Sequence, residues 1–485
     1  MRTTMLKYSM RTFFLSTLAM LLFAANSSAV NVYFNGSTSS DFLTATNWTP
    51  NGVPGNNLFD SYGIDDGLTA TLSSGNPIVN ALRVGSVDKT HGTGSNHYGK
   101  LTISAGATLG VIGSNALSVG RENQVYYPVA GDYNQNTVVD MADYVLWRDT
   151  VGSSTDLRAD GDGNNVVDQG DYSYWRSQFG NVVRGGEVAV TGGSTLNANG
   201  ILIGERTRGV VSIDATSTVN ARIWDTTVTP NQFGGTEDVR IGGYGPAYDD
   251  FGSEPGLNGN GLLDVKGNFN AKDVYVSEHG STGELRLNGP GKINLNGTLH
   301  MDFCGGCVTD PVGLAKRSST VSIIGSGGTF NVGLDPDSTV VDPSPPPRDL
   351  LAASTTATLS FTADAGGVTP IVIAQNTTPE PSGTAYITGA NLVVDLSAYL
   401  SNTPLTLISA PPTHLVGTFG SVKFLGGRSA TVNYDMANGK VFLSNFHLGA
   451  GALAGAAVPE PSVFALLGLA LFIVAPRTRR ISSAG

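Results

Sequence analysis

A repeat at an offset of 28 residues constrains the fold of this chain more than any other feature of its sequence. Residues 132–143 match residues 160–171, and the match continues as far as Arg148 with Arg176. Each copy begins with a segment rich in Asp and Asn and continues with apolar residues at helical spacing. The repeat therefore predicts two copies of one loop–helix unit that pack against each other.

The spacing of oxygen-bearing residues in each copy fits a calcium-binding loop. Calcium takes about six to eight oxygen ligands, and a loop of about 12 residues supplies them from positions 1, 3, 5, 7, 9 and 12. In the first copy these positions are Asp132, Asn134, Asn136, the Val138 carbonyl, Asp140 and Asp143. In the second they are Asp160, Asp162, Asn164, the Val166 carbonyl, Asp168 and Asp171. We expect two calcium ions, one in each loop.

Two other loop positions refine this expectation. Position 8 is Val139 or Val167, which we expect to fill the core between the paired loops. Position 6 is usually glycine because the loop turns sharply there. Here it is Thr137 or Asn165, and Asn tolerates the left-handed conformation better than Thr. The first loop is therefore expected to bind calcium more weakly.

Over roughly residues 129–181 the pair resembles a type I dockerin, two calcium loops each followed by a helix. The phrases at 131–134 and 143–148 also resemble the variant found in planctomycete-type secreted proteins. In dockerins the residues at loop positions 10 and 11 contact a cohesin partner. The resemblance implies a protein partner, of cohesin type or another, that contacts Met141, Ala142, Gln169 and Gly170.

Both ends of the chain carry export signals. Residues 1–29 have a basic start, an apolar stretch and small residues before a cleavage point, as in a signal peptide. Residues 458–485 resemble the PEP-CTERM sorting tail of bacterial envelope proteins, which implies a C-terminal membrane segment before processing. The residues that carry this resemblance are Pro459, Glu460 and Pro461 before an apolar run, and Arg477, Arg479 and Arg480 after it. We expect an exported protein of the cell envelope, the outer surface or the extracellular medium.

The remaining sequence indicates strands. Apolar residues recur at spacings of +2 and +6, as in Leu101, Ile103, Leu109 and again in Val188, Val190, Leu196. This pattern, with Gly and Asn at the corners, predicts an all-β, right-handed parallel β-helix with the small helical unit inserted. A β-sandwich is the alternative, because periodicity alone cannot set strand direction. The repeats also resemble those of autotransporter-like passenger domains.

Near the C-terminus, residues 431–434 and 441–443 should form a hairpin across an Asn-Gly turn.

The features described above divide the chain into eight parts. The parts are a signal peptide (1–29), a first solenoid part (30–128), the dockerin-type module (129–181), a second solenoid part (182–333), a Pro-rich linker (334–349), a C-terminal β region (350–448), a spacer (449–457) and the sorting tail (458–485).

Charge and composition narrow the function. The net charge of −11 argues against a nucleic-acid partner and suits cation binding. We expect a scaffold or adhesin-like surface protein that attaches through its calcium module, and the sequence nominates no catalytic residue. The alternative is a polysaccharide-degrading β-helix enzyme, a glycoside hydrolase or lyase, which needs converging carboxylates. On the polar row between the apolar positions only Asp264 and Arg286 are charged, and we interpret them as solvated.

Overall fold

The computed structural model describes most of the chain between residues 30 and 448. Within the described residues no helix is both long and apolar enough to cross a membrane. The predicted signal peptide, linker residues 334–348, the spacer and the sorting tail lie outside them. The described ranges are 30–55, 60–87, 96–113, 117–122, 131–134, 136–205, 207–221, 238–243, 259–278, 281–303, 318–333, 349–353, 355–374 and 383–448.

Over the described residues the fold is mostly β, with three sheets that we name A, B and C. Sheet A contains, in spatial order, β2 (Trp48–Thr49), β1 (Asn31–Phe34), β3 (Ser61–Ile64), β6 (Ala81–Val87), β9 (Leu117–Glu122), β12 (Ile201–Glu205), β15 (Val239–Ile241), β18 (Val274–Glu278), β21 (Leu299–Phe303), β24 (Asp349–Ala353), β27 (Thr384–Tyr386) and β30 (Leu415–Val416).

Sheets B and C have the same spatial order along the molecule. Sheet B contains β4 (Leu68–Leu72), β7 (His97–Ile103), β10 (Arg184–Val190), β13 (Arg208–Ile213), β16 (Asn260–Val265), β19 (Thr282–Asn288), β22 (Ser318–Ile324), β25 (Ala357–Thr362), β28 (Asn391–Asp395) and β31 (Ser421–Leu425). Sheet C contains β5 (Ile78–Val79), β8 (Thr108–Val111), β11 (Thr195–Ala198), β14 (Thr218–Asn220), β17 (Asn268–Ala271), β20 (Lys292–Leu295), β23 (Thr329–Val332), β26 (Ile371–Ile373), β29 (Leu405–Ser409), β33 (Lys440–Leu448) and β32 (Arg428–Asp435).

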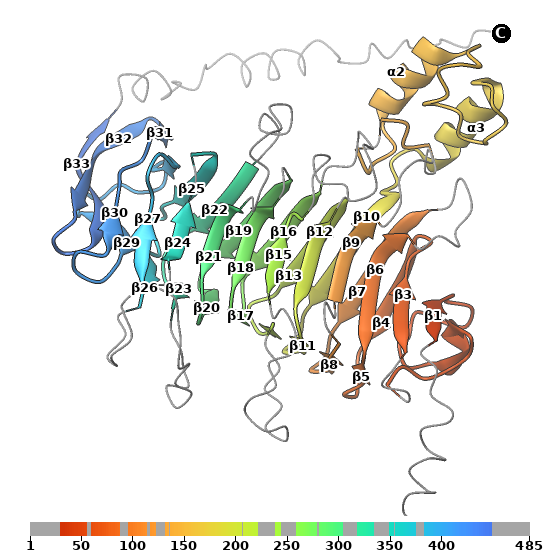
Figure 1. The fold of residues 1–485 in the computed structure, drawn as a ribbon, viewed down its shortest axis with the longest axis horizontal. Coiled ribbons are helices and arrows are strands. Elements are labelled where there is room, and N and C mark those ends of the chain that lie inside the picture. Colours follow the sequence, from red (N-terminus) through yellow and green to blue (C-terminus); the bar gives the residue numbers. More distant parts are fainter. Residues whose placement is uncertain are drawn as a thin grey trace, which may run out of the picture.

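Neighbouring strands within the body of each sheet are three apart in the sequence, so the chain visits A, B and C in turn. Among the described strands, pairing is antiparallel only at the two ends, for β1 with β2 and for β33 with β29 and β32. All other pairs are parallel, unlike the antiparallel sheets of a β-sandwich. Figure 1 shows the resulting elongated stack, with the helices at one side.

The predicted apolar positions stack in register. Val188 lies opposite Leu101 and Val211 in sheet B, and Leu196 lies opposite Leu109 in sheet C. All five side chains are buried. The spacing of +2 and +6 thus marks one strand of sheet B and the following strand of sheet C. We call one passage of the chain through sheets A, B and C a rung, and each rung buries its apolar side chains against the rungs beside it.

The corner between sheets A and B requires glycine. At Gly209, the second residue of β13, an added Cβ would lie 2.2 Å from the carbonyl oxygen of Val119. Gly204, near the end of the preceding sheet A strand, has a φ of +73° and a similarly close backbone neighbour. Side chains are excluded here because the backbones of adjacent rungs approach each other closely.

The C-terminal β region continues the same three sheets. Strands β24, β25 and β26 pair in parallel with β21, β22 and β23. The predicted hairpin is confirmed, with Tyr434 opposite Val441 and Val432 opposite Leu443. One stack therefore spans the described residues on both sides of the Pro-rich segment.

Aromatic residues close the N-terminal end of the stack. The Trp48 ring is fully buried and meets Phe34, Phe42 and Tyr62 edge-on at centroid distances of 5.1–5.2 Å. Its indole nitrogen donates a 2.8 Å hydrogen bond to the carbonyl of Phe42. These contacts cover the apolar end of the core where β1 and β2 end the stacking.

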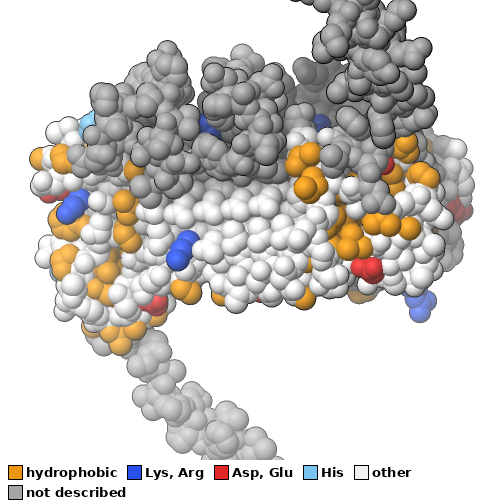
Figure 2. All heavy atoms as spheres, turned by 90° about the horizontal axis from the view of Figure 1, so that it is seen from below, with side chains coloured by type: hydrophobic (Ala, Val, Ile, Leu, Met, Phe, Trp, Pro, Cys, Tyr) orange, Lys and Arg blue, Asp and Glu red, His pale blue; other side chains and the backbone are white. Residues whose placement is uncertain are grey.

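The outward side of sheet C is polar and regular. Side-chain amides connect five successive strands in a ladder of hydrogen bonds of 2.8–3.1 Å. Figure 2, which views the molecule from below, shows uncharged polar and backbone atoms in even rows across the middle of this face. Each ladder bond joins one rung to the next. Its members are Asn197, Asn220, Asn270, Asn294 and Asn331.

Candidate metal centre

The two α-helices that the described residues contain fall, in sequence order, between two neighbouring turns of the stack. Strands β7, β8 and β9 precede them and pair with β10, β11 and β12, which follow them. The helices are α2 (Met141–Thr150) and α3 (Gln169–Gln178). The chain therefore leaves the stack after β9 of sheet A and returns to it at β10 of sheet B (Figure 1).

Both helices begin at predicted calcium ligands. Asp140 caps α2 by accepting a 2.7 Å hydrogen bond from the backbone N–H of Ala142. Asp143 completes a capping box by accepting a 2.8 Å bond from the backbone N–H of Asp140. Asp168 and Asp171 do the same for α3. The carboxylates at positions 9 and 12 are thereby fixed relative to the helix axis.

In loop one (132–143) the ligand side chains turn their oxygens inward. The Asp132 carboxylate accepts hydrogen bonds of 2.9 Å from the backbone N–H groups of Asn136 and Thr137. The side-chain oxygens of Asn134 and Asn136 accept from backbone N–H groups two residues ahead, each at 2.9 Å. The loop is thus curled around the oxygens of positions 1, 3 and 5.

Loop two (160–171) repeats these contacts at the same positions. Asp160 accepts from the backbone N–H groups of Asn164 and Asn165 at 3.1 and 2.9 Å. Asp162 and Asn164 each accept from the residue two places ahead, at 3.1 and 2.9 Å. The predicted equivalence of the two loops therefore extends to their hydrogen bonds.

A carboxylate cluster in loop two has the dimensions of a cation site. Oxygens of Asp160, Asp162 and Asp171 lie within 4.8 Å of one another. Asp160 and Asp171 are buried and Asp162 is exposed, so the cluster opens to solvent on one side. Burial raises the pKa of Asp171 above its usual value, because the charged form loses hydration. Gathered anions of this kind fit a hard cation held by oxygen ligands.

The sharp turn at position 6 is present in both loops. Thr137 has a φ of 83° and Asn165 a φ of 68°, both in the left-handed region. Asn adopts this region readily, whereas the branched Cβ of Thr makes it unfavourable. Both loops therefore make the turn expected at position 6, and the predicted difference in strain between them stays a prediction from the residue types Thr and Asn.

The two loop–helix units make reciprocal contacts, in which each loop pairs with the chain that follows the helix of the other unit. We call this arrangement the two-fold exchange. Val139 of loop one pairs with the chain after α3. Its N–H donates to the carbonyl of Asn181, and its carbonyl accepts from the N–H of Gly180. Val167 of loop two pairs in the same way with Ser153 and Gly152 after α2. Both valines are fully buried in a small core of their own, as predicted for position 8. The other buried members of this core are Tyr133, Ala159, Trp175 and Val183.

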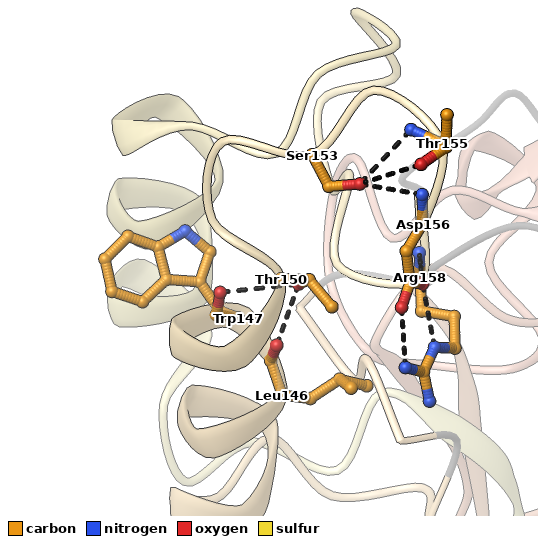
Figure 3. A network of polar contacts seen from close by, with 7 residues as sticks. All are labelled: Leu146, Trp147, Thr150, Ser153, Thr155, Asp156 and Arg158. Atoms are coloured by element: carbon orange, nitrogen blue, oxygen red, sulfur yellow. Dashed lines mark hydrogen bonds and ion pairs between the residues drawn. The ribbon is translucent and has the colours of Figure 1, made fainter.

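The connection from α2 to loop two is held by local polar contacts (Figure 3). The Thr150 hydroxyl donates to the carbonyls of Leu146 and Trp147 at 2.8 and 3.3 Å. The Ser153 hydroxyl accepts backbone N–H groups of the following turn, the shorter bond being 2.8 Å from Asp156. Asp156 also binds Arg158 through two bonds of 2.7 and 2.8 Å. All of these contacts are local, within the last turn of α2 and the turn that follows it.

The predicted partner-binding residues are exposed at the starts of the helices. Met141 has 55% of its surface exposed, and Ala142, Gln169 and Gly170 are also exposed. Because α2 and α3 are related by the two-fold exchange, these residues form two similar exposed helix starts.

The polar row between the apolar positions lies in one register across sheet B. Its two charged members each bind a nearby polar side chain. Arg286 binds Glu284 through two bonds of 2.8 and 2.9 Å. Asp264 lies opposite Arg286 and accepts a hydrogen bond from Asn288. The full row is Thr102, Ala189, Ser212, Asp264, Arg286 and Ser322.

One residue at the site was not found by sequence reasoning. Arg184, the first residue of β10, has its Nε 3.5 Å from an oxygen of Asp132, the first ligand position of loop one. Burial raises the pKa of Asp132 to about 7, and the nearby Arg184 charge opposes this rise. No local signal marks Arg184, because it lies beyond α3 and reaches the loop only through the strand it begins.

No family model, curated protein or solved structure matches this chain. The sorting residues Pro459, Glu460, Pro461, Arg477, Arg479 and Arg480 lie outside the described part of the chain.

Proposed function

We propose that this protein is an exported, envelope-sorted surface protein that displays a dockerin-type module with two calcium sites for attachment to a protein partner. Its β body serves as a scaffold or adhesin-like support. The observation that carries the proposal is the repetition, in both loops, of the same inward-facing oxygens at the same ligand positions.

The body is proposed to be a right-handed parallel β-helix. The strands of its three sheets recur every third strand along the chain, which is the order of a continuous coil. Connections between parallel strands of one sheet are right-handed in nearly all proteins, because a right-twisted strand returns to its sheet most easily that way. A stack of this kind offers a stiff support, since every rung is hydrogen-bonded to the next.

Calcium suits the two loops better than other common metals. The ligand positions offer carboxylate, amide and backbone carbonyl oxygens, and neither loop contains Cys or His. Hard cations prefer such oxygens, whereas zinc prefers Cys and His. Magnesium demands near-ideal octahedral geometry, while calcium accepts the larger, flexible ligand set of a long loop. Calcium would neutralise the clustered carboxylates and join each loop to the start of its helix through Asp143 or Asp171.

The partner is proposed to bind the exposed helix starts. Met141 and Ala142 on α2, and Gln169 and Gly170 on α3, flank the ligand residues directly. A calcium ion in each loop would therefore fix the position of the contact surface. The partner class suggested by the dockerin resemblance is a cohesin-type protein, and the export signals at the ends of the sequence bring the module to the cell exterior.

Calorimetric titration of the full-length chain with CaCl₂ after chelator treatment tests this proposal. We expect binding at two sites and weak or no binding of MgCl₂ under the same conditions. Asp171→Asn should abolish the site in loop two, and Asp143→Asn the site in loop one. Asp264→Asn, on the outward side of sheet B, serves as the matched control and should leave both sites intact. A chain that gives no calcium heat would overturn the proposal.

A further inference from the structure

The module and the β body share a buried ion pair. Arg184 begins β10 and lies in register with His97 of β7, so its backbone belongs to sheet B. Its guanidinium reaches Asp132 in loop one, and the two side chains are 2% and 0% exposed. The backbone N–H of Val183 also donates to the carbonyl of Thr137 at 3.0 Å. Loop one is therefore joined to the body by a charged contact and a backbone contact.

Loop two has a different arrangement at the equivalent place. The approximate two-fold exchange relates the chain after α3 to the chain after α2, and at the repeat offset Arg184 corresponds to Asp156. Asp156 binds Arg158, not a ligand of loop two. Among the described residues, Asp160 has no ion pair that would correspond to the contact between Arg184 and Asp132. Among the described residues, a guanidinium therefore lies beside the first ligand position of loop one and not beside that of loop two.

A guanidinium beside a calcium ligand opposes calcium binding. Arginine keeps its positive charge at every physiological pH, so it cannot leave the site by losing a proton. Calcium bound by Asp132 would share this carboxylate with a permanent cation, and the burial of both groups limits screening by solvent. The negative charge of the Asp132 carboxylate, which calcium needs at position 1, is already balanced by the positive charge of Arg184.

We propose that Arg184 is a built-in counter-ion of loop one that lowers its calcium affinity and couples calcium occupancy to the contact between the module and the β body. This inference rests on the proposed calcium function. Calcium and Arg184 compete for the same carboxylate, so filling loop one weakens the contact at the junction. By linkage, the junction contact weakens calcium binding by the same factor. Loop two fills first, and loop one then responds to higher calcium concentrations by loosening the module from its support.

The main test uses the full-length chain with loop two disabled by Asp160→Asn, so that calorimetry reports loop one alone. In this background Arg184→Met, which keeps most of the side-chain volume but removes the charge, should raise the calcium affinity about ten-fold or more. Arg184→Lys keeps the charge and should stay close to the parent. Arg208→Met, which breaks the half-buried pair with Glu187 on the neighbouring strand, is the control for loss of an arginine and should change nothing.

A second measurement needs no substitution. Amide hydrogen exchange of the wild-type chain should become faster at residues 183–186 as the calcium concentration passes the range in which loop one fills. Unchanged exchange there, or a loop-one affinity that Arg184→Met leaves unaltered while calcium still binds, would overturn the role of Arg184 and leave the calcium function standing. Absence of calcium binding in both loops of the wild-type chain would instead refute the proposed function itself.

Discussion

The indole nitrogen of Trp147 donates a 2.8 Å hydrogen bond to the backbone carbonyl of Asp168, the ninth position of the opposite loop. Trp175 makes the reciprocal bond of 2.9 Å to Asp140. Each helix therefore holds the loop that precedes the other helix.

Trp147→Phe should destabilise the module, because phenylalanine keeps the ring packing but leaves the Asp168 carbonyl without its donor. We expect a loss of about 1 kcal/mol in local stability, the usual net value of one hydrogen bond. Hydrogen exchange over residues 141–178 in chelator would measure it. Val145→Leu, at an exposed position of α2, is the control. If both variants exchange at the same rate, the indole bond does not hold the loop.

Thr137→Gly should relieve the left-handed strain in loop one. Removing the Cβ at a φ of 83° is expected to stabilise the chain by about 1 kcal/mol, after allowing for the flexibility of glycine in the unfolded state. The calcium affinity of loop one should rise accordingly. Asn165→Gly, at the same position of loop two, should give a smaller change because Asn already tolerates this conformation. Equal gains in the two loops, measured by calorimetry, would show that strain does not distinguish them.

Deletion of residues 131–180, with the ends joined by a short glycine linker, should leave the stack folded. The rungs on either side of the module pair directly in all three sheets, and Asp132 near the start of the module contacts Arg184, which follows its end. Far-ultraviolet circular dichroism should keep its β signal. Loss of that signal would mean that the module is needed to form the stack.

Gly209→Ala should be strongly destabilising. The new methyl group would meet the Val119 carbonyl at 2.2 Å, and that atom belongs to the backbone of a neighbouring rung. We expect a loss of about 2–3 kcal/mol, as for overpacked cores, and a lower Tm. Gly52→Ala is the control, since a Cβ there meets nothing within 4 Å. Thermal unfolding curves that match for the two variants would contradict the tight corner.

Deletion of residues 463–485 should release the protein into the medium. This segment carries the apolar run and the arginines on which the predicted membrane retention depends. Fractionation of producing cells, followed by immunodetection, would measure the change. A control replaces Pro379 and Pro381 with alanine, altering the second Pro-Glu-Pro motif that lacks an apolar run, and should not change the distribution. Identical fractionation of the truncated and full-length proteins would remove the sorting hypothesis.

The sequence by itself determined the features that depend on local spacing. The predicted ligand positions of both loops, the helices after them and the apolar pairs such as Val188 and Val190 all depend on residues close together in the chain. Their physical causes are local: loop curvature around oxygen ligands, helix capping, and the period-2 alternation of a strand. The Asn-Gly hairpin near the C-terminus was predictable for the same reason.

Only the tertiary structure decided how these pieces pair. Strand direction is absent from an alternating pattern, so the three parallel sheets and the continuation of the stack through β24, β25 and β26 required knowledge of non-local hydrogen bonds. The contact of Arg184 with Asp132 likewise joins residues far apart in the sequence. Its ion pair exists because the module leaves and re-enters the stack at one corner, which buries the first residue of β10 against the first residue of loop one.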